Sequence, residues 1–259
     1  MDSLLSPVRW VGRTTTSFVS AIGRGALLSV DAGRSLRKVD MWGPLLIPEM
    51  VSIGVASIPL ALFIAAFTGV VLAIQASYTF VGTVPLYFVG ALVGKTIILE
   101  LGPVLTGLAL SGRVGASNAS EIATMRVTEQ IDALESLAYD PVAYLVVPRV
   151  LAGTLMFPIV ISFAIATGIA AGWLTSIALL DLATPQFVRG LRLFFDPYDV
   201  QFALFKSATF GATVTSVGAF FGYTCRGGAR GVGRATTRAV VVSSMIILVL
   251  DAFWAATLL

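Results

Sequence analysis

The chain has 259 residues and a formal charge of +3, with 57% hydrophobic and only 12% charged residues. Soluble domains carry about 25% charged residues because their surfaces face water, so this composition excludes a soluble protein and predicts an all-α integral membrane protein. The absence of histidine and the single cysteine, Cys225, exclude histidine metal sites, imidazole catalysis and an intrachain disulfide, and the scattered basic residues do not suggest nucleic-acid binding.

Residues 1–45 are predicted to form an amphipathic helix region that lies on the membrane surface. Six basic residues stand among positions 1–40, and between them apolar positions recur at three- and four-residue steps, namely Leu4, Val8, Val11, Thr15, Phe18 and Ile22. The segment lacks the uninterrupted apolar stretch and small-residue cleavage site of a signal peptide. Its Arg, Ser and Thr content leaves an organelle transit peptide as the alternative.

About five apolar segments are long enough to cross a hydrocarbon layer of about 30 Å at 1.5 Å per residue. They cover residues 50–78, 87–111, 150–180, 200–223 and 240–258. Pro148 and Pro158 are expected to end or kink the helix in the first part of the third span.

The distribution of Lys and Arg predicts the orientation of these spans. Six basic residues of the amino-terminal segment, three within 112–149 and four in the link after the fourth span lie on one side. The links on the other side hold only Arg189 and Arg192. The positive-inside rule therefore predicts a cytoplasmic amino terminus.

The second span contains GALVGKT at 90–96, which resembles a nucleotide-binding loop. A Walker A motif has four residues between its first Gly and the Gly-Lys pair, whereas Gly90 and Gly94 are separated by three. Because the motif lies inside an apolar run, we interpret the two glycines as a close helix contact. Similar pairs stand at 168/172 and 218/222. The chain is therefore predicted to carry no ATP site.

Four ionisable residues fall within the predicted spans, namely Lys95, Glu100, Lys206 and Asp251. An unpaired charge in the bilayer costs several kcal/mol, so such residues usually find partners or face a watery cavity. Lys206 and Asp251 lie at similar depth and are the predicted pair, with Glu100 nearby. Two interpretations stay open: ion pairs that only lock helices together, and a role in substrate passage.

Residues 119–138 are predicted to form a cytoplasmic helix, because five charges stand between 121 and 137 and no Gly or Pro interrupts them. Val127, Ile131 and Leu134 make an apolar stripe that would face the membrane domain. A solvated connector would need only a few residues, whereas this link runs from 112 to 148. The segment is therefore predicted to dock a partner.

Several blocks of the sequence resemble the MlaE-type permeases, the membrane subunits of ABC transporters that move lipids with Mce-domain proteins. The matching stretches are ELGPVLTGLALSGRVGA at 100–116, EIATMRVTEQIDALESLAYDP at 121–141, VPRVLAG at 147–153 and GVGRATTRAVV at 231–241. They occur in the family's order and extend from the second span onward.

The resemblance implies a homodimeric permease that docks cytoplasmic ABC ATPase subunits, lies beneath periplasmic Mce-domain subunits and, in some systems, works with a small STAS-type subunit. The chain itself would need no cofactor, since ATP and Mg²⁺ would bind in the ATPase. Glu100 and Lys206 match charged membrane positions of the family. The expected ATPase contacts are Arg126, Glu129, Gln130, Asp132 and Glu135, and the expected lipid-cavity residues are Leu72, Gln75 and Tyr78.

Such a protein is expected in the bacterial inner membrane, with the chloroplast inner envelope as the alternative. The sequence does not fix the lipid head group or the direction of transport. A rival hypothesis is an ion-driven secondary transporter that uses Lys206, Glu100 and Asp251 as a relay, although the sequence contains no evident inverted repeat. A third is a structural membrane scaffold, which would tolerate the loss of all four intramembrane charges.

Overall fold

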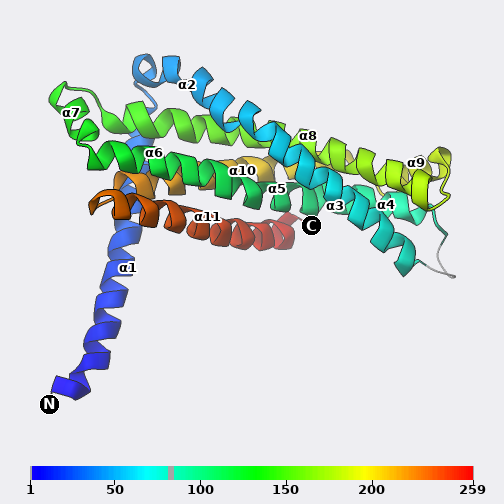
Figure 1. The fold of residues 1–259 in the computed structure, drawn as a ribbon, viewed down its shortest axis with the longest axis horizontal. Coiled ribbons are helices and arrows are strands. Elements are labelled where there is room, and N and C mark those ends of the chain that lie inside the picture. The colour runs from blue at the N-terminus through cyan, green and yellow to red at the C-terminus, as the bar shows by residue number, and fades with distance from the viewer. Residues whose placement is uncertain (1, 81–84, 259) are drawn as a thin grey trace.

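The computed structural model describes residues 2–80 and 85–258, and over these residues the chain forms helices and no strand. The elements are α1 (Asp2–Ser35), α2 (Val39–Ile53), η1 (Val55–Ser57), α3 (Ile58–Thr79), α4 (Phe88–Thr96), η2 (Ile97–Leu101), α5 (Gly102–Leu110), η3 (Ser111–Gly115), α6 (Ala116–Val127), α7 (Gln130–Ser136), η4 (Val142–Val146), α8 (Val147–Leu179), α9 (Thr184–Leu193), α10 (Pro197–Tyr223) and α11 (Gly228–Leu258). The long helices form an elongated bundle with α7 at one end and α9 at the other (Figure 1).

Four helical segments of the described residues are long and apolar enough to cross a membrane: Val39–Thr79, Phe88–Val127, Val142–Leu179 and Gly228–Thr257. They overlap with four of the predicted spans, and the prediction of an all-α membrane protein is confirmed. The remaining predicted span, 200–223, lies in α10. This helix is less apolar because it carries Lys206 and repeated Ser, Thr and Gly. It packs against α6, α8 and α11, so protein and not lipid covers much of it.

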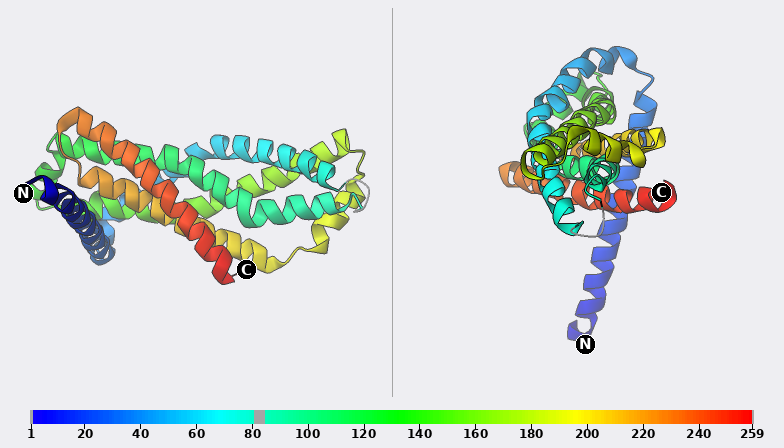
Figure 2. Two further views of the ribbon diagram at one scale, coloured as in Figure 1. Left: turned by 90° about the horizontal axis from the view of Figure 1, so that it is seen from below. Right: turned by 90° about the vertical axis from the view of Figure 1, so that its right-hand side faces the viewer.

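Helix α1 leaves the bundle crosswise to the bundle's long axis (Figures 1 and 2). Val19, Ile22 and Leu27 on this helix are 58–65% exposed. The direction suits a helix that lies in the plane of a membrane crossed by the bundle. The other apolar positions predicted for its stripe, Leu4, Val8, Val11 and Phe18, lie outside the described side chains.

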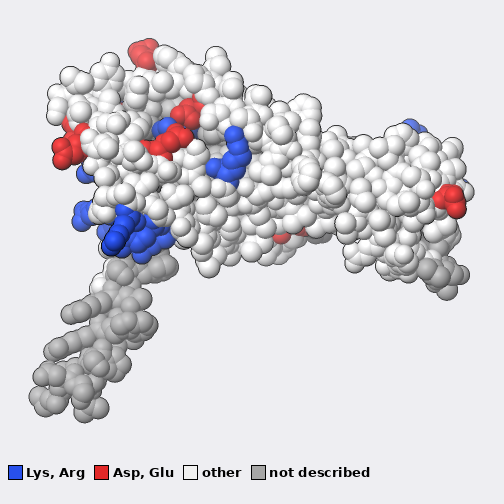
Figure 3. Space-filling view, in the orientation of Figure 1, with Lys and Arg blue, Asp and Glu red and all other residues white. Residues whose placement is uncertain are grey.

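Charged side chains gather at one end of the bundle, on the face shown in Figure 3, over α6, α7 and the start of α11. The stretch between this end and the opposite end is nearly free of charge on the same face. An uncharged belt between two polar ends is the surface that a hydrocarbon layer requires.

The helix of the second span runs from Phe88 to Val127, far beyond the predicted boundary at 111. Its π-helical turns, η2 and η3, carry Glu100 and Arg113. The extension into 112–118 is stabilised by packing, since Val114, Gly115 and Asn118 are buried. The Gly, Arg, Ser and Asn residues of this segment predict the end of a lipid-facing span. The helix continues through them because they pack against neighbouring helices and not against lipid.

Two further expectations differ from the structure. Residues 119–138 were predicted as one helix, but α6 ends at Val127 and α7 begins at Gln130, because Glu129 adopts a left-handed backbone with φ of 61°. Helix α8 continues through Pro158 without a break. Pro148 stands in the first turn of α8, where its missing N–H costs nothing, and the π-helical turn η4 precedes it.

Glycines bring several helices into backbone contact. A Cβ on Gly69 of α3 would collide with the carbonyl oxygen of Gly168 of α8, and a Cβ on Gly90 of α4 would collide with that of Phe187 in α9. Gly90 therefore serves as a helix contact within the chain, as predicted, and the GALVGKT segment lies entirely on helix α4 and not in a nucleotide-binding loop.

Candidate functional site

Three helices meet at an ionic cluster formed by Lys206 of α10, Glu100 of η2 and Asp251 of α11. The Lys206 side chain is fully buried, and its Nζ donates hydrogen bonds to Glu100 Oε2 at 2.8 Å and to the Leu99 carbonyl oxygen at 3.1 Å. Nζ also forms an ion pair with Asp251 Oδ1. The structure thus brings together the predicted pair and places Glu100 in direct contact with it.

The cluster holds one ammonium and two carboxylates, so it carries a net negative charge when all three are ionised. Glu100 is 36% and Asp251 21% exposed at the side chain, whereas Lys206 has no exposed surface. A buried charge must keep a counter-charge, because leaving it unpaired is strongly destabilising. The cluster therefore ties α10 to η2 and α11 and presents its carboxylates, not its ammonium, to the surroundings.

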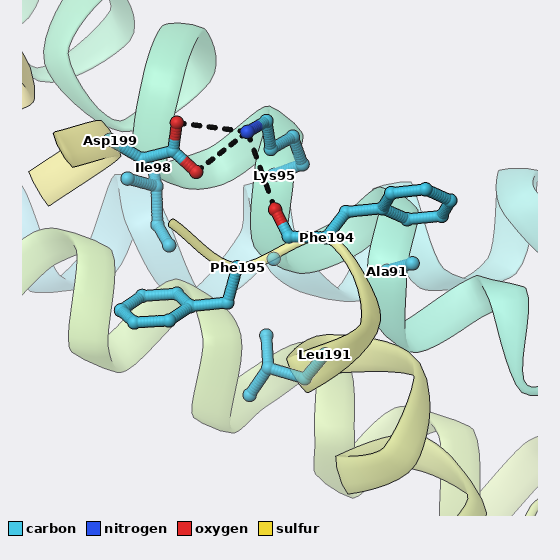
Figure 4. Close-up of a pocket in the computed structure, with 8 residues that line it drawn as sticks. Ala91, Lys95, Ile98, Leu191, Phe194, Phe195 and Asp199 are labelled. Atoms are coloured by element: carbon cyan, nitrogen blue, oxygen red, sulfur yellow. Dashed lines mark hydrogen bonds and ion pairs between the residues drawn. The ribbon is translucent and has the colours of Figure 1, made fainter. Parts of the chain in front are cut away.

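Lys95 does not join this cluster. Its Nζ lies 2.8 and 2.7 Å from the two carboxylate oxygens of Asp199 and donates to the Phe194 carbonyl oxygen at 3.3 Å (Figure 4). The Asp199 side chain is only 5% exposed. The contact fastens the first turn of α10 and the loop before it to α4, at the end of the bundle opposite α7.

Asp199 was not among the predicted site residues. It stands in the sequence DPYD, where Asp196 and Asp199 form a reciprocal capping box at the start of α10. An acidic or hydroxyl residue followed three positions later by another acid is a known sign of a helix start. This signal identifies the cap, but it does not reveal that Lys95 lies against it.

A groove of about 370 Å³ runs along α3 where it faces η2 and α5. Its lining is apolar apart from Thr68 and Gln75, and it comprises Phe67, Thr68, Val71, Leu72, Gln75, Leu101 and Leu105. Two of the three expected lipid-cavity residues, Leu72 and Gln75, lie in this groove, whereas Tyr78 is 77% exposed and does not line it. Leu101 directly follows Glu100, so η2 contributes one residue to the groove and the next to the ionic cluster.

Helix α7 forms a compact projection after α6. Ile131 is fully buried in a cluster with Ile122 and Leu145, which anchors α7 to the bundle. Arg126 Nη1 donates to Asp132 Oδ1 at 2.6 Å and so closes the turn between the two helices. The Arg126 guanidinium also lies 5.9 Å from the ring centroid of Tyr223. Two of the predicted ATPase contacts, Arg126 and Asp132, thus stabilise the turn between α6 and α7.

The remaining predicted contacts, Glu129, Gln130 and Glu135, are exposed. Two apolar residues that sequence reasoning missed, Leu137 and Tyr139, are 70% and 47% exposed beside them. They follow α7 at the charged end of the bundle, where the uncharged belt no longer covers the surface. Exposed apolar side chains among acidic ones are typical of a protein interaction surface.

The end of α7 has an unusual backbone. Ala138 has φ of 61°, and the amide groups of Ala138 and Tyr139 donate to the carbonyl oxygens of Glu135 and Leu134 at 3.0 Å each. This is the Schellman arrangement that usually employs glycine at the left-handed position. With Glu129 on its other side, α7 is bracketed by two strained non-glycine residues, a feature that often marks functional segments.

Comparison with known proteins gives a consistent result. A family model described as Permease MlaE matches residues 46–257. A probable ABC transporter permease protein of Rickettsia prowazekii is 39% identical over 246 residues, 95% of each chain. The intermembrane phospholipid transport system permease protein MlaE of Haemophilus influenzae is 31% identical over 242 residues, 93% of each chain. The chloroplastic protein TRIGALACTOSYLDIACYLGLYCEROL 1 of Arabidopsis thaliana is 33% identical over 198 residues, 76% of this chain and 57% of that protein.

Proposed function

The chain belongs to the MlaE permease family, and on that premise we propose that this ABC transporter permease moves phospholipid between a bacterial inner membrane and an extracytoplasmic partner. The energy comes from ATP hydrolysis in a separate ATPase subunit, which also holds the ATP and Mg²⁺. The permease works as a homodimer beneath Mce-domain subunits, with its amino terminus in the cytoplasm.

The observation that carries the proposal is the projecting α7. A membrane protein without a nucleotide-binding loop needs an external energy source, and α7 offers a shaped surface for a partner. Glu129, Gln130 and Glu135 are exposed on it, while Arg126 and Asp132 fix its position. The segment stands at the end of the bundle where basic residues gather, which the positive-inside rule assigns to the cytoplasm.

The groove along α3 supports a lipid as the transported molecule. Its lining is almost entirely apolar, and its volume of about 370 Å³ suits part of an acyl chain. Gln75 offers one exposed amide in this lining. The phospholipid assignment rests on the relative from Haemophilus influenzae, whose name states phospholipid transport.

Lysine substitution at the start of α7 tests the coupling to an ATPase. Glu129→Lys with Gln130→Lys should remove a co-purifying ATPase from mild detergent extracts, while the permease itself still inserts and elutes as a folded dimer. Asp40→Lys, which reverses an exposed acid at the start of α2, is the matched control and should retain the ATPase. Normal lipid-stimulated ATP hydrolysis in the α7 variant would refute the proposal.

A charge swap shows whether Arg126 and Asp132 bind the ATPase directly or only hold α7 in position. Arg126→Asp combined with Asp132→Arg preserves the ion pair that closes the turn between α6 and α7. If these two residues act only by holding α7, the swap should restore most of the coupling that either single substitution removes. If they bind the ATPase directly, the swap should fail as the single variants do.

A further inference from the structure

A second ionic cluster lies at the start of α8, away from the one around Lys206. The Arg149 side chain is only 9% exposed, and its Nη2 lies 3.3 Å from Glu49 Oε1 and 3.1 Å from Glu121 Oε2. Its Nη1 donates to the Leu145 carbonyl oxygen at 2.9 Å. One guanidinium on α8 thus holds a carboxylate of α2 and a carboxylate of α6 at the same time.

The Glu121 side of this cluster leads to α7. Glu121 lies on α6, which continues to Val127 and is joined to α7 by the Arg126–Asp132 ion pair and by the burial of Ile131. The structure thus provides a continuous path of contacts from α7 through α6 to the Glu121 carboxylate.

The Glu49 side leads to the groove. Glu49 lies on α2, one turn before the junction at Gly54 where α2 passes through η1 into α3. A Cβ on Gly54 would collide with Met156 of α8, so the junction is pressed against that helix. A second arginine holds the same junction, since Arg113 of η3 donates to Ser57 Oγ. Helix α3 then supplies most of the groove lining.

Arginine is suited to such a link. Its planar guanidinium group can donate to two carboxylates at once. Because the group is buried, losing both carboxylates would leave an unpaired charge and strongly destabilise the protein. Its Nε is buried without a hydrogen-bond partner among the described residues. A carboxylate that shifts along the guanidinium therefore finds a further donor, so the cluster can change geometry and stay paired.

We propose that Arg149 is a positioning residue that carries displacement of α6 and α7 to α2 and α3 and thereby changes the shape of the groove. This inference rests on the proposed function, because it assigns to Arg149 the transmission of ATPase motion to the lipid site. Glu49 and Glu121 are the two ends of the link.

Glu49→Gln is the variant of choice. It leaves Arg149 paired with Glu121, so no buried charge is stranded, whereas Arg149→Met would leave two facing carboxylates and could prevent folding. Asp40→Asn on the same helix removes an exposed acid and is the matched control. The permease is reconstituted with its co-purifying ATPase in vesicles of phosphatidylethanolamine and phosphatidylglycerol, and transfer of a fluorescent phospholipid is measured with ATP.

Distances are measured in parallel by pulsed electron resonance in a Cys225→Ser background, with labelled chain diluted in unlabelled chain. Two label pairs share a reference at Gln186→Cys on α9: one reports α7 through Ser136→Cys, the other reports α3 through Phe63→Cys, all at exposed positions. Each pair is compared between the nucleotide-free state and the state trapped with ATP and vanadate.

In the Glu49→Gln protein we expect ATPase binding and the α7 displacement to persist, the α3 displacement to vanish and lipid transfer to fall by about 5-fold or more. The role of Arg149 is overturned if α3 in the Glu49→Gln protein moves as far as in the wild type. It is also overturned if lipid transfer falls only in proportion to the amount of folded protein. If the wild type itself shows no ATP-dependent transfer, the proposed function fails and the inference fails with it. If the wild type shows ATP-dependent transfer but α3 still moves in the Glu49→Gln protein, the inference is rejected and the proposed function stands.

Discussion

Removing both acidic partners of Lys206 should destabilise the protein far more than the two single substitutions together. The Lys206 side chain has no exposed surface, and Nζ contacts Glu100 and Asp251. Glu100→Gln or Asp251→Asn alone leaves the ammonium one carboxylate, so each should cost about 1 kcal/mol, the scale of one hydrogen bond. The double variant strands a buried charge, which costs about 3–5 kcal/mol. The expected non-additivity is therefore about 1–3 kcal/mol.

The free energy of unfolding is measured in mixed micelles by titration with a denaturing detergent, for the wild type, both single variants and the double variant. A triple variant that adds Lys206→Met to the double variant is the control, because it removes the stranded charge and should recover much of the lost stability. A double variant that costs no more than the sum of the single variants would show that Lys206 is not held as a buried ammonium. The account of the cluster would then be wrong.

Three smaller predictions concern the segment around α7. Burial alone would raise the pKa of Asp140, but hydrogen bonds from Lys38 and Ser35 and from two backbone amides outweigh it and hold the pKa below its usual value. The carboxylate therefore contributes stability above about pH 4, the unfolded pKa, and this contribution should disappear as the pH falls through the lower folded pKa. Ala138→Gly should raise the free energy of unfolding by about 1 kcal/mol, because glycine adopts φ of 61° without strain. Leu137→Asp should change stability by less than about 0.5 kcal/mol, since its side chain faces water, yet weaken capture of the ATPase.

Each of these has a control at a comparable position. Asp140→Asn should lose the acid-dependent part of the stability profile, and an unchanged profile would contradict the role of its carboxylate. Ala133→Gly, in the exposed middle of α7, should destabilise by about 1 kcal/mol, so equal effects at the two alanines would contradict the backbone explanation. Leu155→Asp, 50% exposed within the apolar segment Val142–Leu179, should cost about 2–3 kcal/mol of membrane insertion, and equal tolerance at both leucines would contradict the assignment of this segment as a membrane span.

Much of the helical framework follows from the sequence, because apolar runs of membrane length have few other structures available. The depth argument that paired Lys206 with Asp251 also succeeded, since both residues lie on regular helices whose rise per residue is fixed. The three π-helical turns could not be predicted, because they depend on packing between helices and not on local composition.

The partner of Lys95 and the break in the docking segment depended on tertiary structure. Asp199 lies 104 residues from Lys95 in the sequence, and no local pattern links the two. The break at Glu129 places a non-glycine residue in the left-handed region, which propensity disfavours. It is held there by the burial of Ile131 and by the Arg126–Asp132 ion pair. The apolar stripe predicted that Ile131 would face the membrane domain, but the ion pair across the break is not visible in the sequence alone.

Lipid transfer in proteoliposomes tests the central claim most directly. The permease is reconstituted with and without its co-purifying ATPase, and movement of a fluorescent phospholipid is followed with ATP, without ATP, and with an imposed ion gradient. We predict transfer only when the ATPase and ATP are both present, and its loss when Glu129→Lys and Gln130→Lys are introduced on α7. Transfer by the permease alone, driven by the ion gradient and abolished by substitutions at Glu100 or Asp251, would contradict the account and identify a secondary transporter.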